Sequence, residues 1–196
     1  MPADRRFLRR IALLNCHFAR NLAYYRGGFV SRDGTGHLID MSEVGRTVNG
    51  NFLDIAVLEW CKLFADWNSR HHWRRAIETF AAQTRFRAEL LASLGIHLTA
   101  WESYLETVRT YRDKFVAHLD NEEVAIIPSM ELALGSSVFL HSHLSRTVPP
   151  GTLESIHGPD IPRDLASYFD ACHAEAGTRF TPAQEAAVPL RPYLQL

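Results

Sequence analysis

The segment Asn51–Trp67, NFLDIAVLEWCKLFADW, carries apolar residues on nearly every face that a helix presents. Such a helix is stable only where neighbouring elements cover it on most sides. The segment therefore predicts a protein built around one central, buried helix. Asp54 and Glu59 lie on this segment, and each needs a partner or water because burying an unpaired carboxylate is costly.

The rest of the chain repeats apolar residues at helical spacing. The first helix is expected to be capped by Asp4 and to end at Gly27 and Gly28. A long glycine-rich loop follows over residues 29–50, of which the part from Ser42 can already be helical. Further helices are expected at residues 73–94 with Gly95 as the stop, at 99–120 behind a capping box in Thr99–Glu102, at 128–146 and at 162–176.

Strand-like composition is confined to Val124–Ile127, and four residues cannot form a sheet. The sequence thus predicts an all-α fold, a single-domain bundle of five to six helices with a long loop after the first. The domain spans residues 1–196, with its core at about 4–176 and an irregular, proline-containing tail at 177–196.

Charge and cysteine content narrow the class of protein. The net charge of −1 indicates no polyanionic or membrane partner. The segment that ends at Arg32, however, contains seven arginines and a single acidic residue, Asp4. This local excess of positive charge suits a solvated helix face or a nucleic-acid surface. No apolar run is long enough to span a membrane. Three widely spaced cysteines in apolar contexts favour buried thiols, so we expect a cytoplasmic protein.

One arginine lies where the helical period asks for an apolar residue. The inward stripe of the helix expected at 99–120 reads Trp101, Leu105, Val108, Arg112, Phe115 and Leu119. A guanidinium keeps its proton, so burying it alone is unfavourable. Three interpretations follow: Arg112 pairs with an inward acid such as Asp54 or Glu59, it lines a wet cleft that binds an anion, or that cleft forms only where two chains meet.

The segment Arg112–His118, RDKFVAH, resembles the R-x(4–6)-H motif of HEPN domains, with Asp113 matching the Asn, Asp or His that often follows the arginine. The surrounding YRDKFVAHLD most resembles the HEPN branch associated with abortive-infection U-type proteins of bacteria. NCHFARNLAYYR, NGNFLDIAVLEWCKLFAD and HHWRR resemble the upstream sequences of that branch. The resemblance covers residues 5–146.

The resemblance implies an all-α bundle that forms a homodimer and brings two motifs together at a composite cleft. Active members are metal-independent endoribonucleases, often toxins or antiphage effectors, which implies an RNA substrate, an antitoxin or other protein partner, and no metal or cofactor. In that role His118 acts as general base on a ribose 2′-OH or as general acid on the leaving oxygen. Arg112 clamps the scissile phosphate. Asp113 either orients a catalytic group, pairs with a neighbour of Lys114, or serves only capping and solubility. Tyr111 and Lys114 contact RNA.

Many HEPN members use the motif only for structure or binding. The alternative is therefore a non-catalytic HEPN-like module that binds RNA, nucleotide or a protein partner, with Arg112 in a structural ion pair that specifies packing. An aromatic pocket away from Arg112 and His118 would favour this alternative. The chain contains four tryptophans that either line such a pocket or belong to the core: Trp60, Trp67, Trp73 and Trp101.

The histidine pairs of the chain are spaced poorly for a metal site. His71 and His72 are adjacent, and His141 and His143 are two apart, whereas useful ligand pairs on a helix lie three or four apart. His141 falls on an apolar stripe, which indicates a hydrogen-bonded core residue.

Overall fold

The computed structural model of the protein describes residues 4–31, 33–117, 127–154 and 160–180. These residues form six α-helices, two π-helical turns and one 3₁₀ turn, and the only strand-type pairing among them is an isolated bridge between Phe29 and Leu38. The predicted all-α class is confirmed.

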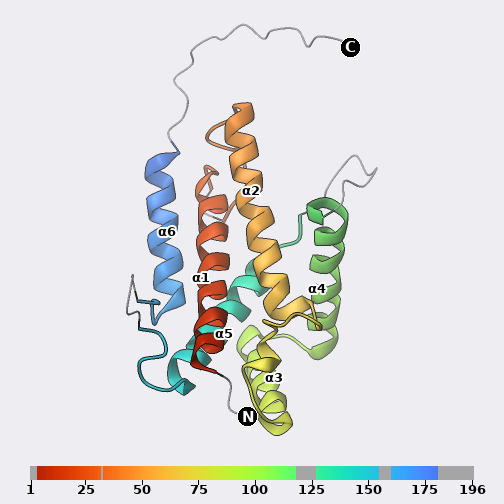
Figure 1. Ribbon diagram of the computed structural model, residues 1–196. Coiled ribbons are helices and arrows are strands. Elements are labelled where there is room, and N and C mark those ends of the chain that lie inside the picture. The colour runs from red at the N-terminus through yellow and green to blue at the C-terminus, as the bar shows by residue number, and fades with distance from the viewer. Residues whose placement is uncertain (1–3, 32, 118–126, 155–159, 181–196) are drawn as a thin grey trace, which may run out of the picture.

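Helices α6, α1 and α2 lie side by side, with α1 (Arg5–Gly27) in the middle (Figure 1). The predicted cap of α1 is confirmed, because Asp4 Oδ1 accepts a hydrogen bond from the backbone N–H of Arg6. At the other end Gly28 has φ −75° and does not need glycine's conformational freedom. Gly27 is required for space instead, since a Cβ there would collide with that of Ala176 on α6 (Leu165–Arg179).

Helix α2 (Glu43–Trp60) begins inside the segment that the sequence assigned mainly to a loop. Ser42 Oγ caps it by accepting from the Gly45 N–H at 3.0 Å. The inward side of α2 is fully buried, but Val44, Val48 and Ile55 are 71%, 39% and 42% exposed. Within residues 51–67, for which burial on nearly every face is predicted, Ile55 and Trp67 are exposed, so the prediction is wrong at these two positions.

Two helices change to π-helical hydrogen bonding at their C-terminal ends. Helix α2 continues into η1 (Cys61–Ala65), and α4 (Leu98–Tyr111) continues into η3 (Arg112–Ala117). The expectation of one regular α-helix over 99–120 is wrong for Arg112–Ala117, and residues 118–120 lie outside the described residues. The capping box is also absent, because α4 starts after His97, which makes no side-chain cap.

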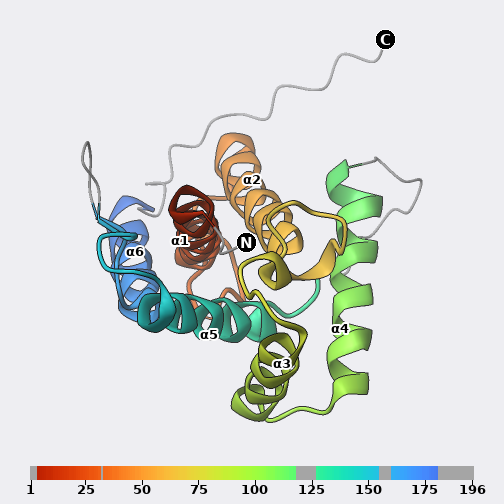
Figure 2. The ribbon, with the colours of Figure 1, turned by 60° about the horizontal axis from the view of Figure 1, so that its bottom comes forward.

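The helix expected at 73–94 is divided. A short 3₁₀ turn η2 (Trp73–Arg75) precedes α3 (Phe80–Leu94), which is capped by Thr79 Oγ1 accepting from the Ala82 N–H. The predicted stop is confirmed, because Gly95 has φ +65° at the end of α3. Helix α5 (Glu131–Thr147) crosses the bundle in contact with α6, α1 and α3 (Figure 2).

The buried apolar side chains form one contiguous cluster around Trp60, which is fully buried. Trp60 contacts the rings of Phe64, Trp101 and Tyr104, and its indole N–H donates to Ser136 Oγ on α5 at 3.0 Å. This aromatic cluster joins α2, η1, α4 and α5. It thereby fixes where the ends of α2 and α4 meet.

The three cysteines are buried, as expected. Burial raises the pKa of the Cys16 and Cys61 thiols to about 12 and also raises the pKa of Cys172. Within the described ranges, no helix has the length and apolar character that crossing a membrane requires.

Candidate functional site

Arg112 meets an acid at the junction of the two π-helical turns. It is the first residue of η3, and Asp66 directly follows η1, with its backbone N–H donating to Cys61 O at 2.8 Å. Nη1 of Arg112 binds Asp66 Oδ1. The Arg112 side chain is 16% exposed and that of Asp66 is 30% exposed. The ion pair therefore lies at the edge of the core and ties the end of α4 to the end of α2.

Asp113 binds the remaining guanidinium nitrogens. Its Oδ1 accepts from Arg112 Nε at 2.8 Å and lies 2.8 Å from Nη2. Burial lowers the pKa of Arg112, but the hydrogen bonds to Asp66 and Asp113 outweigh it and raise that pKa above its usual value. The arginine thus stays charged, with all three nitrogens bound to carboxylate. The Asp113 side chain is 54% exposed and can leave this arrangement without unpacking the core.

The two acids expected to pair with Arg112 lie elsewhere. Glu59 pairs with Lys62 at 3.2 Å. Asp54 is half-buried beside Tyr111, and burial raises its carboxyl pKa. The predicted Arg112–Asp54 or Arg112–Glu59 pair is therefore wrong, because the π-helical turn at 61–65 brings Asp66 to the arginine. Asp66 belongs to the same apolar segment, seven residues after Glu59, and that spacing was the available signal.

The supporting residues have different environments. Tyr111 is buried against Phe115, with ring centroids 5.6 Å apart, and burial followed by the nearby Asp54 raises the pKa of its hydroxyl to about 12. Tyr111 is thus a packing residue in this chain. Lys114 is half-buried within η3. His118, the other catalytic candidate, lies outside the described residues.

A second arginine is anchored one turn before Arg112. Arg109 donates from Nη2 to the backbone oxygen of Ala65 at 3.0 Å, and its Nη1 pairs with Glu106 at 2.7 Å. Arg109 and Arg112 therefore both hold the segment Ala65–Asp66. The next residue, Trp67, lies outside the core and is 63% exposed.

Trp67 belongs to a pocket of about 660 Å³ that sequence reasoning did not assemble. Three aromatic and three cationic side chains line it, together with Gln83, Thr84 and His72: Trp67, Trp73, Phe80, Arg74, Arg75 and Arg87. We refer to this hollow as the Trp67 pocket. The guanidinium carbon of Arg74 lies 3.6 Å from the centroid of the Trp67 ring and 5.3 Å from that of Trp73. Trp73 in turn stacks on Phe86 of α3, with ring centroids 4.7 Å apart.

His72 supports the wall of the Trp67 pocket from inside. Its Nε2 donates to Phe64 O at 3.1 Å, and its Nδ1 accepts from the Arg74 N–H at 3.4 Å. Burial lowers its pKa to about 4, so the ring is neutral at pH 7. His72 is therefore a structural residue. The run SRHHWRR, which places three arginines and a tryptophan within seven residues, was the signal in the sequence.

The other histidines do not form a metal site within the described residues, where no group of three His, Cys, Asp or Glu side chains could hold a metal ion. His141 is fully buried, and its Nε2 donates to Pro162 O at 2.6 Å. The predicted hydrogen-bonded core role of His141 is confirmed. His143 packs edge-on against Phe86 with ring centroids 5.0 Å apart.

Comparison of the chain with models of protein families, with curated proteins and with solved structures finds no match.

Proposed function

We propose that this chain is a HEPN-like, metal-independent endoribonuclease that acts as a homodimer, with Arg112 and His118 at the centre of its site. The observation that carries the proposal is the placement of Arg112. Asp66 anchors the guanidinium from the neighbouring π-helical turn, while the exposed Asp113 fills the positions that a phosphate would take. A phosphate that displaces Asp113 finds a charged, pre-oriented partner.

The chemistry follows from the two residue types. Arg112 stabilises the charge that develops on the scissile phosphate, and Lys114 adds a cation on the same turn. His118 takes the proton from the ribose 2′-OH or gives one to the leaving oxygen, because an imidazole titrates near neutral pH. No metal or cofactor enters this mechanism. The biological role proposed with it is that of a toxin or antiphage effector, with an antitoxin as the protein partner.

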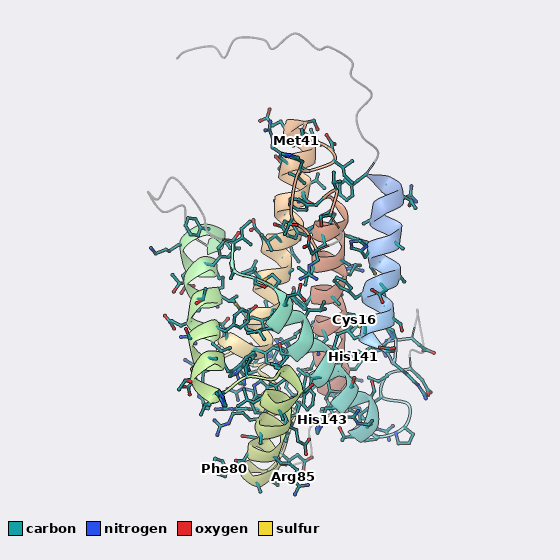
Figure 3. All side chains as sticks on the ribbon, turned by 180° about the vertical axis from the view of Figure 1, so that it is seen from behind. Cys16, Met41, Phe80, Arg85, His141 and His143 are labelled. Atoms are coloured by element: carbon teal, nitrogen blue, oxygen red, sulfur yellow. The ribbon has the colours of Figure 1, made fainter. Side chains whose placement is uncertain are left out.

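An apolar stripe on α2 supports the homodimer. Val44, Val48 and Ile55 recur at helical spacing on its outer side and are exposed. Met41, just before the helix, is 53% exposed and lies at the projecting end of α2 (Figure 3). We expect Val48→Glu to convert the dimer to a monomer in sedimentation, and Thr47→Glu, at an exposed neighbouring position, to leave the dimer intact.

The decisive experiment is cleavage of bulk tRNA by the purified protein in EDTA. Wild type is compared with Arg112→Ala and His118→Ala, and with Arg46→Ala as a matched control at an exposed position of α2. Each variant is first checked for folding and oligomeric state. We expect cleavage by wild type and Arg46→Ala and none by the other two. Cleavage that survives in folded His118→Ala protein contradicts the proposal.

A second candidate function is favoured by two observations. The chain already binds all three guanidinium nitrogens of Arg112 with its own carboxylates. The aromatic Trp67 pocket, in addition, does not include Arg112 in its lining. In this candidate the protein is a non-catalytic HEPN-like module, and Arg112 holds α4 to η1. Asp113→Asn separates the two candidates. In the ribonuclease it frees the guanidinium and increases RNA cleavage, whereas in the binding module it changes only stability.

A further inference from the structure

The Trp67 pocket is lined by three arginines and by no carboxylate, whereas the hollow that contains Arg6, Arg10 and Arg70 also contains Asp4. Among the described residues, none of the ion pairs includes Arg74, Arg75 or Arg87, and no carboxylate contributes to the lining. By contrast, the hollow beside Arg26 contains Glu131, which pairs with that arginine at 2.7 Å. The Trp67 pocket therefore presents positive charge that the chain itself does not neutralise.

The environment of Arg74 makes this charge significant. Its guanidinium is half-buried and is held by the face of Trp67. Burial lowers the pKa of Arg74, and the neighbouring Arg87 lowers it further. Two cations that repel each other in a half-buried hollow are stabilised by an anion placed between them. The first requirement of a ligand is thus a negative group.

The second requirement comes from the flat surfaces of the Trp67 pocket. Phe80 is 83% exposed at the outer end of α3 (Figure 3). It is followed on the same helix face by Gln83 and Arg87, at i+3 and i+7. The Arg74 guanidinium covers Trp67 and lies 5.3 Å from the centroid of Trp73, so it belongs to the same group of flat surfaces. Aromatic rings and guanidinium planes are the surfaces on which proteins stack unpaired bases.

Gln83 adds a directed polar group. Its Nε2 donates to Arg74 O at 2.9 Å and to Ile77 O at 2.8 Å. Because carbonyl oxygens only accept, these bonds fix the amide so that Oε1 remains as an acceptor at the pocket wall. An acceptor in this position suits the amino group of a base or a ribose hydroxyl.

We propose that the Trp67 pocket binds an unpaired nucleotide, with the base stacked on Phe80 and on the plane of Arg74, and the phosphate bound by Arg87 and Arg75. The site is separate from the Arg112 pair, although Asp66 and Trp67 are consecutive residues. The ligand is either a free nucleotide or one nucleotide of a single strand. Both present the same base and phosphate.

The test is fluorescence anisotropy at low salt with a labelled, short 2′-O-methyl RNA strand, which resists cleavage. Trp67→Ala, Arg74→Met and Arg87→Met are compared with Arg85→Met, an exposed arginine of α3 that does not line the pocket (Figure 3). We expect each pocket variant to weaken binding about tenfold. Arg85→Met should bind as wild type does. Trp67 is exposed, so its replacement leaves the fold intact.

Competition with AMP identifies the source of the nucleotide. Displacement of the strand by AMP assigns a free nucleotide, and displacement only by unlabelled single strand assigns a nucleotide within a strand. The proposal is overturned if the wild type binds neither probe, or if Arg85→Met weakens binding as much as Arg74→Met. The latter result would show general attraction to a basic surface rather than a site.

The proposal does not depend on cleavage. If the wild type binds the resistant strand but cleaves no RNA, the pocket stands and the ribonuclease proposal fails. If cleavage depends on Arg112 while the pocket variants bind and cleave normally, the ribonuclease stands and the pocket proposal fails.

Discussion

Arg112 and Arg74 contact consecutive residues, Asp66 and Trp67, yet their charges are treated in opposite ways. Arg112 is bound by two carboxylates, whereas Arg74 is covered by an indole face and lies beside another arginine. The first arrangement is complete within the chain. An anion bound from outside would stabilise the second. A half-buried arginine therefore indicates a ligand site only where the chain supplies no carboxylate partner.

The largest change in stability is expected at His72, which hydrogen-bonds the backbone of Phe64 and of Arg74. In the folded protein the pKa of His72 is about 4, whereas in the unfolded chain the pKa of the same imidazole is about 6.5. The unfolded state therefore takes up the proton first. The contribution of neutral His72 to the free energy of unfolding is fully present above pH 6.5. It decreases as the pH falls from 6.5 toward 4, by about 3 kcal/mol in total.

Denaturant unfolding at a series of pH values measures this effect. We expect His72→Gln to flatten the loss of stability between pH 6.5 and 4, and His97→Gln, an exposed control, to leave it unchanged. Equal acid dependence of the free energy of unfolding in wild type and His72→Gln would show that neutral His72 does not stabilise the fold.

The next effect tests the Arg112 side. We expect Arg112→Ala to lower the free energy of unfolding by about 2 kcal/mol, because Asp66 is left without its charged partner at the edge of the core. In a double-mutant cycle with Asp66→Ala, the double variant should lose about 1 kcal/mol less stability than the sum of the losses in the two single variants. Arg46→Ala, at an exposed position, serves as the control. If the two losses add, Arg112 and Asp66 are not coupled, and Asp66 is not the structural partner of Arg112.

Replacement of Arg74 is expected to change stability least. We expect Arg74→Met to change the free energy of unfolding by no more than about 0.5–1 kcal/mol, because the lost cation–π contact is offset by relief of repulsion from Arg87 and by the fit of a thioether against Trp67. Arg112→Met, measured in parallel, should lose clearly more. Equal losses would mean that Arg74, like Arg112, is a structural residue.

The sequence predicted the features that short-range chemistry determines. Asp4 caps α1, Gly95 ends α3 with positive φ, and the tryptophans at 60 and 101 lie in the core. The prediction from sequence was wrong where two possible helix starts compete. Thr79 caps α3, so the helix begins after Thr79 and not at Trp73 as predicted. The box in Thr99–Glu102 is not used, because the helix already begins one residue before Thr99.

The candidate site was predicted only in part, for a physical reason. Helical spacing placed Arg112 toward the interior but not its partner, because a π-helical turn changes the direction of the residues after it and no residue type specifies such a turn. The Trp67 pocket joins the turn at 73–75 to the exposed face of α3. Its members become neighbours only through tertiary packing, which periodicity along one segment does not describe.

The buried cysteines make this chain convenient for site-directed labelling. Cys16, Cys61 and Cys172 are shielded from solvent and their pKa values are raised, so almost none of each thiol is in the nucleophilic thiolate form at neutral pH. A maleimide dye should react far faster with a single cysteine introduced at Thr84, which is exposed at the rim of the Trp67 pocket, than with the native thiols. The native cysteines can therefore remain in place while a reporter on α3 follows what enters the pocket.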